Sequence, residues 1–213
     1  MKKSVLFGGM LAAFTMLATA SGAATVTPVF ADCDPNLPNV PGFGAGTGQC
    51  SNNASRTDAD AINFGAADGS FYSLGLSNAS GTSELIIRID PAFRGPASIV
   101  EVTNPGLHKE AANVFVARED SNGDFDGSTV LFVGQVNNGA GGSVPDVNSV
   151  SFSGVWNFLI FQDQSTTVYS DTRSTDGYDI DAVTVSPVPL PAAGLLLMSV
   201  LGGLGLMGRR RSA

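Results

Sequence analysis

The middle of the chain alternates apolar and polar residues over short stretches. Residues 84–90 place Leu85, Ile87 and Ile89 on one face, and residues 98–103 alternate in the same way. Turn-forming Gly, Pro, Asn and Asp residues separate these stretches from further strand-like ones at 71–76, 112–118, 129–136, 149–152, 155–162, 166–169 and 178–185. Without an amphipathic helix between them, these strands predict an all-β fold, an antiparallel β-sandwich of the jelly-roll kind over residues 55–187.

The N-terminus has a different pattern. Residues 1–3, Met-Lys-Lys, precede an apolar run from 5 to 17 and then a series of small residues. This is the order of regions in a secretory signal peptide. The small residues permit cleavage after Ala20, Ala23 or Ala24, of which the last two are favoured, so we expect residues 1–24 to be a signal peptide.

The C-terminus, residues 188–213, has three parts. Residues 188–192 read Val-Pro-Leu-Pro-Ala, residues 192–208 contain neither a charge nor a proline, and Arg209, Arg210 and Arg211 follow. As a helix the apolar run would reach about 26 Å, which is just short of a hydrocarbon core of about 30 Å. Arginines favour the cytoplasmic side, so we expect a single transmembrane sorting helix over 192–208.

This tail resembles the sorting domain of PEP-CTERM proteins in its VPLPA variant. Val188, Pro189, Leu190, Pro191 and Ala192 match the box, and Arg209, Arg210 and Arg211 match the cationic end. In that family an exosortase in the inner membrane of Gram-negative bacteria processes the substrate, and members reach the cell surface, the outer membrane or the medium, often beside exopolysaccharide genes. The resemblance implies that the exosortase, the secretion machinery and the inner membrane are partners. The alternative is a plain single-pass anchor.

The body carries a second resemblance. Its strand order, together with the Gly-Tyr-Asp-Ile-Asp-Ala-Val run at 177–183 just before the tail, is similar to the discoidin-like, galactose-binding-type jelly rolls of many PEP-CTERM proteins. That resemblance implies a domain that binds glycans or surfaces. We therefore expect an exported, surface-sorted structural or adhesive protein that is not an enzyme and associates with exopolysaccharide or a biofilm matrix. A secreted carbohydrate-active hydrolase is the alternative.

Two cysteines, Cys33 and Cys50, lie in a segment rich in Pro, Gly and Asn, residues 25–54, that has little strand or helix character. An even number of cysteines in an exported protein indicates a disulfide. We expect the bridge to hold an N-terminal loop against the domain.

Charge is concentrated in the body. All 19 acidic residues and only six basic ones lie between residues 25 and 187, so this segment has a formal charge of −13. Nucleic acid is excluded as a partner because phosphate binding needs a basic face. Divalent cations are compatible with this charge.

Calcium is the cofactor that the acidic residues suggest. Asp120, Asn122, Asp124 and Asp126 alternate in a turn between two predicted strands, where their oxygens could converge on one ion, although the EF-hand pattern does not fit. A simple polar hairpin tip is the alternative. Asp176, Asp179 and Asp181 form a second acidic group, either structural or part of a cation site.

Catalytic chemistry has little support in the sequence. His108 is the single histidine and falls in a predicted loop, and the motifs of serine hydrolases, zinc proteases and phosphate-binding loops are absent. A carboxylate pair could hydrolyse glycosides, but 19 acids select no pair. Aromatic side chains could stack on sugars; of the candidates Tyr72, Trp156, Tyr169 and Tyr178, we expect Trp156 in the core and Tyr169 at the surface.

Overall fold

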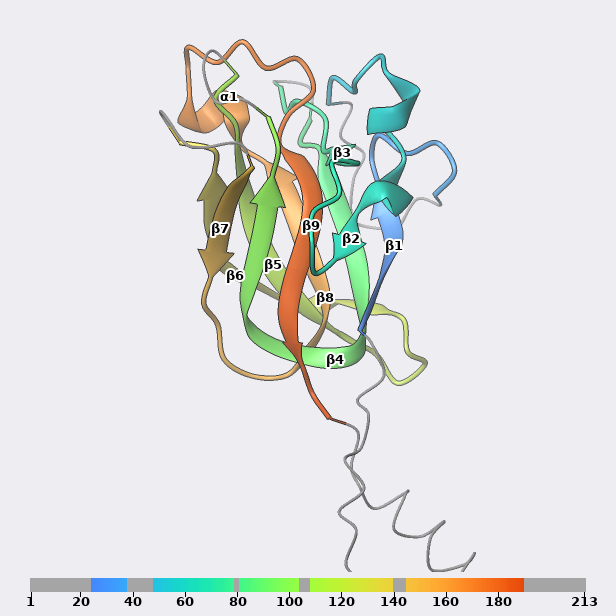
Figure 1. Cartoon of the computed structure of the whole chain (residues 1–213). Coiled ribbons are helices and arrows are strands. Elements are labelled where there is room, and N and C mark those ends of the chain that lie inside the picture. Colours follow the sequence, from blue (N-terminus) through green and yellow to red (C-terminus); the bar gives the residue numbers. More distant parts are fainter. Residues whose placement is uncertain (1–23, 38–47, 79–80, 104–107, 140–144, 190–213) are drawn as a thin grey trace, which may run out of the picture. The chain divides into compact units, whose positions relative to one another are not determined.

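The computed structural model describes residues 24–37, 48–78, 81–103, 108–139 and 145–189 (Figure 1). These residues belong to one compact unit, Ala23–Leu190. The predicted signal peptide up to residue 23, and the tail from residue 190 onward, lie outside them. Within the described ranges, no helix has both the length and the apolar character that a membrane crossing requires.

Nine strands make up the described part of the chain, together with two 3-10 turns (Ala54–Arg56 and Ala59–Ala61) and one short helix, α1 (Ser165–Val168). The strands are β1 (Thr25–Ala31), β2 (Asn63–Phe64), β3 (Tyr72–Ser73), β4 (Glu84–Glu101), β5 (Ala111–Glu119), β6 (Phe125–Asn137), β7 (Asp146–Val150), β8 (Trp156–Asp163) and β9 (Asp179–Pro187).

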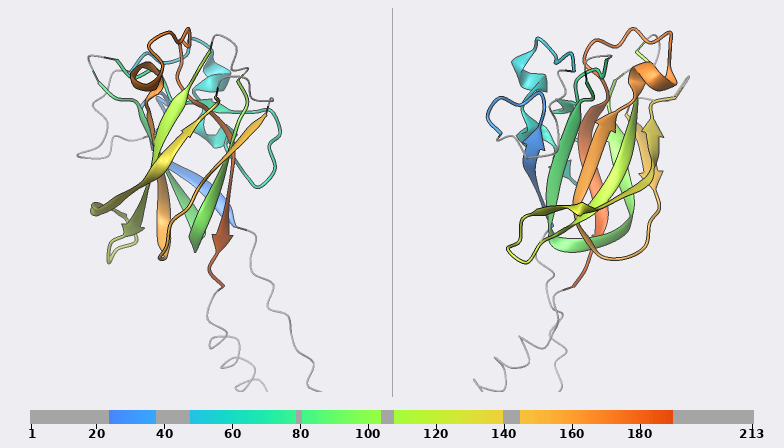
Figure 2. Two further views of the ribbon diagram at one scale, coloured as in Figure 1. Left: turned by 90° about the vertical axis from the view of Figure 1, so that its left-hand side faces the viewer. Right: turned by 180° about the vertical axis from the view of Figure 1, so that it is seen from behind.

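Strand β4 contributes to both layers of the sandwich. Its first half pairs with β1 and β8, and the layer continues through β5 to the edge strand β6. Its second half pairs with β7 and β9, and β9 also carries the short strands β2 and β3. Every pairing is antiparallel except that of β2 with β9. The predicted antiparallel β-sandwich is therefore confirmed, and Figure 2 shows its two layers edge on.

The consecutive apolar residues of β8 are explained by two hydrophobic clusters. Leu159 and Phe161 point into the main core between the layers. Phe158 and Ile160 point the other way, into a smaller cluster on the outer face of the same layer, where Phe30 of β1 also lies. Because both faces of β8 are covered, the strand does not need polar residues at alternate positions.

Several strand predictions differ from the structure. Of residues 71–76, which were expected to form one strand, only Tyr72 and Ser73 form β3, and β2 was not expected. Residues 25–31 were expected to be part of the N-terminal loop, but they form β1, an edge strand in which Pro28 is tolerated and next to which the register shifts. Residues 166–169 form most of α1 and its end rather than a strand. The two strands expected at 84–90 and 98–103 are the two halves of β4.

The chain enters and leaves the sandwich at the same side. Thr25, the first residue of β1, pairs with Asp90, and Pro187, the last residue of β9, pairs with Phe93. We call this the bend end, because residues 90–96 of β4 turn there from one layer to the other (Figure 1). Glu101 and Asp179, at the opposite ends of their strands, mark what we call the acidic end.

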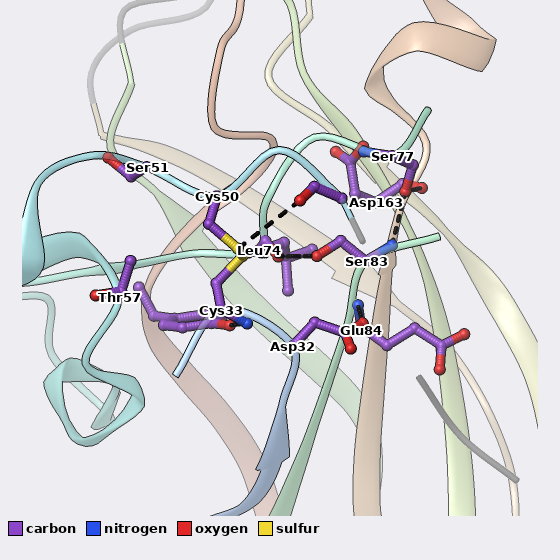
Figure 3. Close-up of a disulfide and its surroundings, with 12 residues drawn as sticks. Asp32, Cys33, Cys50, Ser51, Thr57, Leu74, Ser77, Ser83, Glu84 and Asp163 are labelled. Atoms are coloured by element: carbon purple, nitrogen blue, oxygen red, sulfur yellow. Dashed lines mark hydrogen bonds between the residues drawn. A yellow bond between two sulfur atoms is a disulfide. The ribbon is translucent and has the colours of Figure 1, made fainter. Parts of the chain in front are cut away.

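Cys33 and Cys50 form the predicted disulfide, which joins the segment after β1 to the segment before the first 3-10 turn (Figure 3). The surroundings are tightly packed: the backbone N–H of Cys33 donates to the Tyr72 hydroxyl at 3.1 Å. A Cβ atom on Gly75 would lie 2.5 Å from the Cys33 sulfur, and its φ of +89° also favours glycine. The bridge is therefore part of the packed domain.

Reduction of this disulfide should lower the free energy of unfolding by about 3 kcal/mol, because a closed loop of this length restricts the unfolded chain. Urea denaturation of the protein with and without reductant measures the change. Intact mass after alkylation, before and after reduction, checks the pairing. Two free thiols in the native protein, purified from an oxidising compartment, would contradict it.

Candidate functional site

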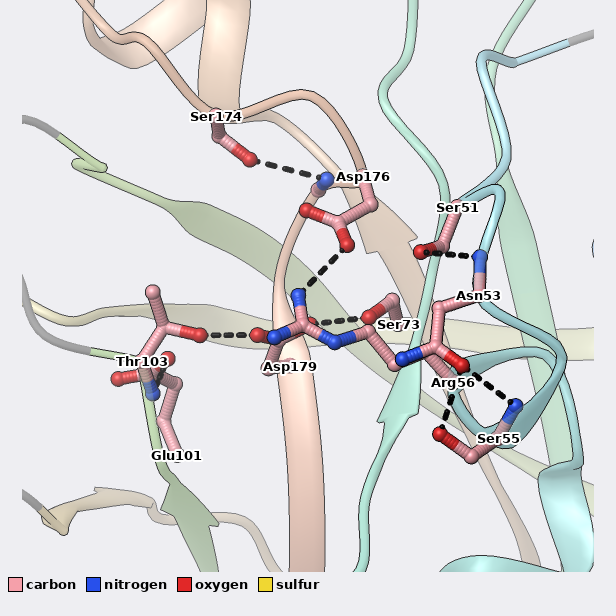
Figure 4. Close-up of polar contacts among 11 residues, drawn as sticks. Ser51, Asn53, Ser55, Arg56, Ser73, Glu101, Thr103, Ser174, Asp176 and Asp179 are labelled. Atoms are coloured by element: carbon pink, nitrogen blue, oxygen red, sulfur yellow. Dashed lines mark hydrogen bonds and ion pairs between the residues drawn. The ribbon is translucent and has the colours of Figure 1, made fainter.

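Three buried carboxylates meet at the acidic end. Glu101 is the last residue of β4, Glu110 directly precedes β5, and Asp179 is the first residue of β9. Their exposed fractions are 0%, 1% and 0%. One oxygen from each carboxylate lies within 4.8 Å of the other two. We call these three residues the acid triad; two of them are visible in Figure 4.

Hydrogen bonds satisfy only part of the acid triad. The hydroxyls of Ser73 and Thr103 donate to the two oxygens of Asp179. The backbone N–H of Thr103 donates to Oε1 of Glu101 at 2.6 Å, and the nearby Ser174 side chain lowers the pKa of Glu110 against the larger effect of burial. Oε2 of Glu101 and Oε2 of Glu110 are buried without a hydrogen-bond partner. Buried polar atoms are rarely left in this state.

One arginine lies near this cluster. Nη1 of Arg56 is 2.9 Å from Oδ2 of Asp176, and the guanidinium lies 4.9 Å from the centre of the Phe71 ring. Its direct ion pair is therefore with Asp176 and not with the acid triad (Figure 4). The positive charge reaches Asp179 and Glu110 only through space.

Burial makes these carboxyl groups poor acids. It raises the pKa of Glu101 to about 8, with a further contribution from the negative charges of Asp179 and Asp146. Burial also raises the pKa of Glu110 and of Asp179 above their ordinary values. Three ionised carboxylates at this place cost the folded state free energy. The arrangement could hold protons or a cation.

Asp163 at the end of β8 positions the start of β9. Its buried carboxylate accepts hydrogen bonds from the backbone N–H groups of Ser77, at 2.8 Å, and Tyr178, at 3.3 Å, and from the Ser165 hydroxyl at 2.6 Å. Burial raises its pKa. The segment before β9 can lie this close to residue 75 only because residue 177 is a glycine: a Cβ atom there would lie 2.4 Å from the Gly75 carbonyl oxygen. Tyr178, the residue before Asp179, is therefore tied to the end of β8.

The second acidic group predicted from the sequence is divided between three roles. Asp179 joins the acid triad. Asp176 pairs with Arg56. Asp181 accepts from the backbone N–H groups of Asp68, at 3.0 Å, and Gly69, at 2.8 Å, and so holds the segment before β3.

Asp120, Asn122 and Asp124 lie, as expected, in the turn between β5 and β6, and Asp126 is the second residue of β6. Oδ1 of Asp120 accepts from the backbone N–H groups of Asn122 and Asp124 at 2.7 and 2.9 Å, and these bonds lower its pKa. Arg88 donates to the Gly123 carbonyl at 2.8 Å. Among the described residues, the carboxylates of this turn do not form a three-ligand group, whereas the acid triad does. Calcium binding by Asp120, Asn122, Asp124 and Asp126 stays a prediction.

The aromatic candidates lie mostly in the core. Trp156 is buried, as expected, and so are Tyr72 and Tyr178. Tyr169 is half-buried beside α1, with the Lys109 ammonium 6.0 Å from its ring centre. His108 is exposed, also as expected.

Glu101 and Glu110 were not among the residues predicted from the sequence. One signal for Glu101 was present: it continues the inward-facing series of Ala97 and Ile99 at every second position, where an acid is out of place. Glu110 has no such signal, because it precedes its strand.

No family model matches the chain, and no curated protein matches it. Solved structures that resemble the chain include two carbohydrate-related domains. One is the family 32 carbohydrate-binding module of EndoD from Streptococcus pneumoniae, with a TM-score of 0.41 and 9% identity over 76% of this chain and 96% of that one. The other is the C-terminal domain of a chitobiase from Bacteroides fragilis, with a TM-score of 0.39 and 9% identity over 80% and 97% of the two chains. A likeness of this degree identifies neither a family nor a ligand.

Replacement of Asp163 by alanine should lower the free energy of unfolding by about 2–4 kcal/mol, because buried N–H donors lose their acceptor. Asp163→Asn keeps one acceptor oxygen, so its free energy of unfolding should lie between those of the wild-type protein and Asp163→Ala. Urea denaturation measures both. Asp171→Ala, which removes an exposed partner of Lys109, is the matched control and should leave stability unchanged. Wild-type stability of Asp163→Ala would contradict the role of this residue.

Proposed function

We propose that this is an exported, surface-sorted structural or adhesive protein, processed by an exosortase, whose sandwich binds extracellular polysaccharide without cleaving it. The observation that carries the proposal is where the chain enters and leaves the sandwich. The first residue of β1 and the last residue of β9 both lie at the bend end, so the tail begins there. The acidic end, with α1 and the disulfide-linked segments, is the opposite side of the sandwich, and we expect the partner to bind on that side.

The boundary of the domain agrees with a tail that acts as a separate signal. The backbone N–H of Val188 donates to the Ala92 carbonyl at 2.7 Å, and Pro189 is exposed. Among the described residues, Val188, the first residue of the proposed sorting box, therefore makes the last backbone hydrogen bond to the sandwich. An exosortase could process the box without removing any residue of β9.

The disulfide supports export, because such bonds persist in oxidising compartments. Burial of the acid triad favours binding over hydrolysis, since glycosidase carboxyl groups must reach the scissile bond. A carbohydrate-active hydrolase remains the second candidate, and a plain single-pass anchor is the alternative for the tail.

Polysaccharide binding can be tested with the exported protein and the exopolysaccharide of its own host. We expect the protein to be retained on the polymer and no new reducing ends to be formed. Tyr169→Ala at the acidic end should weaken retention at least several-fold, because a stacked ring is worth about 1 kcal/mol or more. Phe132→Ala, an exposed aromatic on β6, is the matched control. New reducing ends would instead favour the hydrolase, and absence of retention would contradict binding.

Tail processing can be tested by Pro189→Ala together with Pro191→Ala. Proline fixes φ near −65° and favours an extended residue before it, which suits a protease. The variant should stay in the membrane unprocessed, while the wild-type protein at the cell surface should lack its C-terminal arginines. Intact mass decides between them. Pro35→Ala with Pro145→Ala, at two exposed positions of the domain, is the control. A surface wild-type protein that still ends at Ala213 would indicate a plain anchor.

A further inference from the structure

The acid triad is assembled from three parts of the chain that are far apart in sequence. Glu101 and Glu110 stand on either side of the β4–β5 connection, and Asp179 comes from β9. The side chains of all three are fully buried. Burial of three acids together is costly unless something compensates their charge.

We propose that Glu101, Glu110 and Asp179 bind one calcium ion at the acidic end of the sandwich. This site does not depend on whether the domain binds polysaccharide. It is also distinct from the turn at residues 120–126.

The unpartnered oxygens argue for a cation and against shared protons. A proton held between two carboxyl groups produces a short hydrogen bond between their oxygens. Oε2 of Glu101 and Oε2 of Glu110 have no hydrogen-bond partner of any kind. Each is a buried oxygen without a partner, and a calcium ion that displaces any proton held there would supply one.

The charges around the acid triad do not compensate it. The groups outside the triad that interact with it electrostatically include Asp146, Asp176, Arg56 and the buried hydroxyl of Tyr178. Arg56 is the one cation among these groups, and it is already paired with Asp176. A divalent cation would leave the triad with a formal charge of −1.

The ligand chemistry and the spacing suit calcium. Carboxylate oxygens are hard ligands, and calcium binds them at about 2.3–2.6 Å, so two oxygens on one ion are at most about 5.2 Å apart. One oxygen from each member of the triad lies within 4.8 Å of the others. The hydroxyls of Ser73 and Thr103 donate to the two oxygens of Asp179 and so fix the orientation of this carboxylate, as hydrogen-bond donors do for metal ligands.

The test uses the full-length exported protein, stripped with a chelator and titrated with calcium chloride. We expect one ion bound per chain. We also expect the melting temperature to rise by roughly 5–10 °C when calcium is about a hundredfold above its dissociation constant. Absence of binding, or an equal rise with magnesium chloride, would overturn the assignment to calcium.

Variants locate the ion. Glu101→Gln with Glu110→Gln keeps the side-chain size and removes two carboxylate ligands, so it should lose the calcium response. It should melt no lower than the wild-type protein in chelator, because a buried amide carries no charge at any pH. Asp179→Asn is a second variant that should lose the response if the double variant does not fold. Asp124→Ala with Asp126→Ala is the matched control and should keep the full response. A folded triad variant that responds like the wild-type protein would overturn the proposal, and so would loss of the response in the turn variant alone.

Discussion

The sandwich depends on one strand that belongs to both of its layers. Because β4 runs through the first layer, bends at residues 90–96 and returns in the second, its two ends, Glu84 and Glu101, lie at the same side of the domain. The layers cannot slide independently while this strand is paired on both sides in each of them. The acidic end is built on this constraint, since Glu101 is brought to β9 by the return of β4 and is held there by the ladder.

Much of the fold follows from local pattern. The alternation around Ile87 and Ile99 predicted both halves of β4, and the charged turn at Asp120 predicted the β5–β6 hairpin. Errors arose where a local rule competes with tertiary context. Pro28 argues against a strand, yet an edge strand can accommodate it. The β-branched residues of 166–168 favour a strand, yet the segment forms α1, whose first residue hydrogen-bonds to Asp163.

The candidate site was only partly predictable, because it is a property of three distant segments. Asp179 stood out as one of several acids near the C-terminus, but nothing local distinguished it from Asp181, which supports backbone N–H groups instead. Glu110 could be recognised only after the pairing of β5 with β8 had placed it beside β9. Convergence of this kind requires the register of several strands, and a single sequence does not supply that register.

The position at which the chain leaves the sandwich has a mechanical consequence. Val188 continues directly from β9, which is an inner strand flanked by β4 on one side and by β2 and β3 on the other. A pull between Val188 and the acidic end would run along the axis of β9. The ladder hydrogen bonds lie across that axis, so they would be sheared together and would not open one after another. A protein held by this end can therefore bear tension along an inner strand that is paired on both sides.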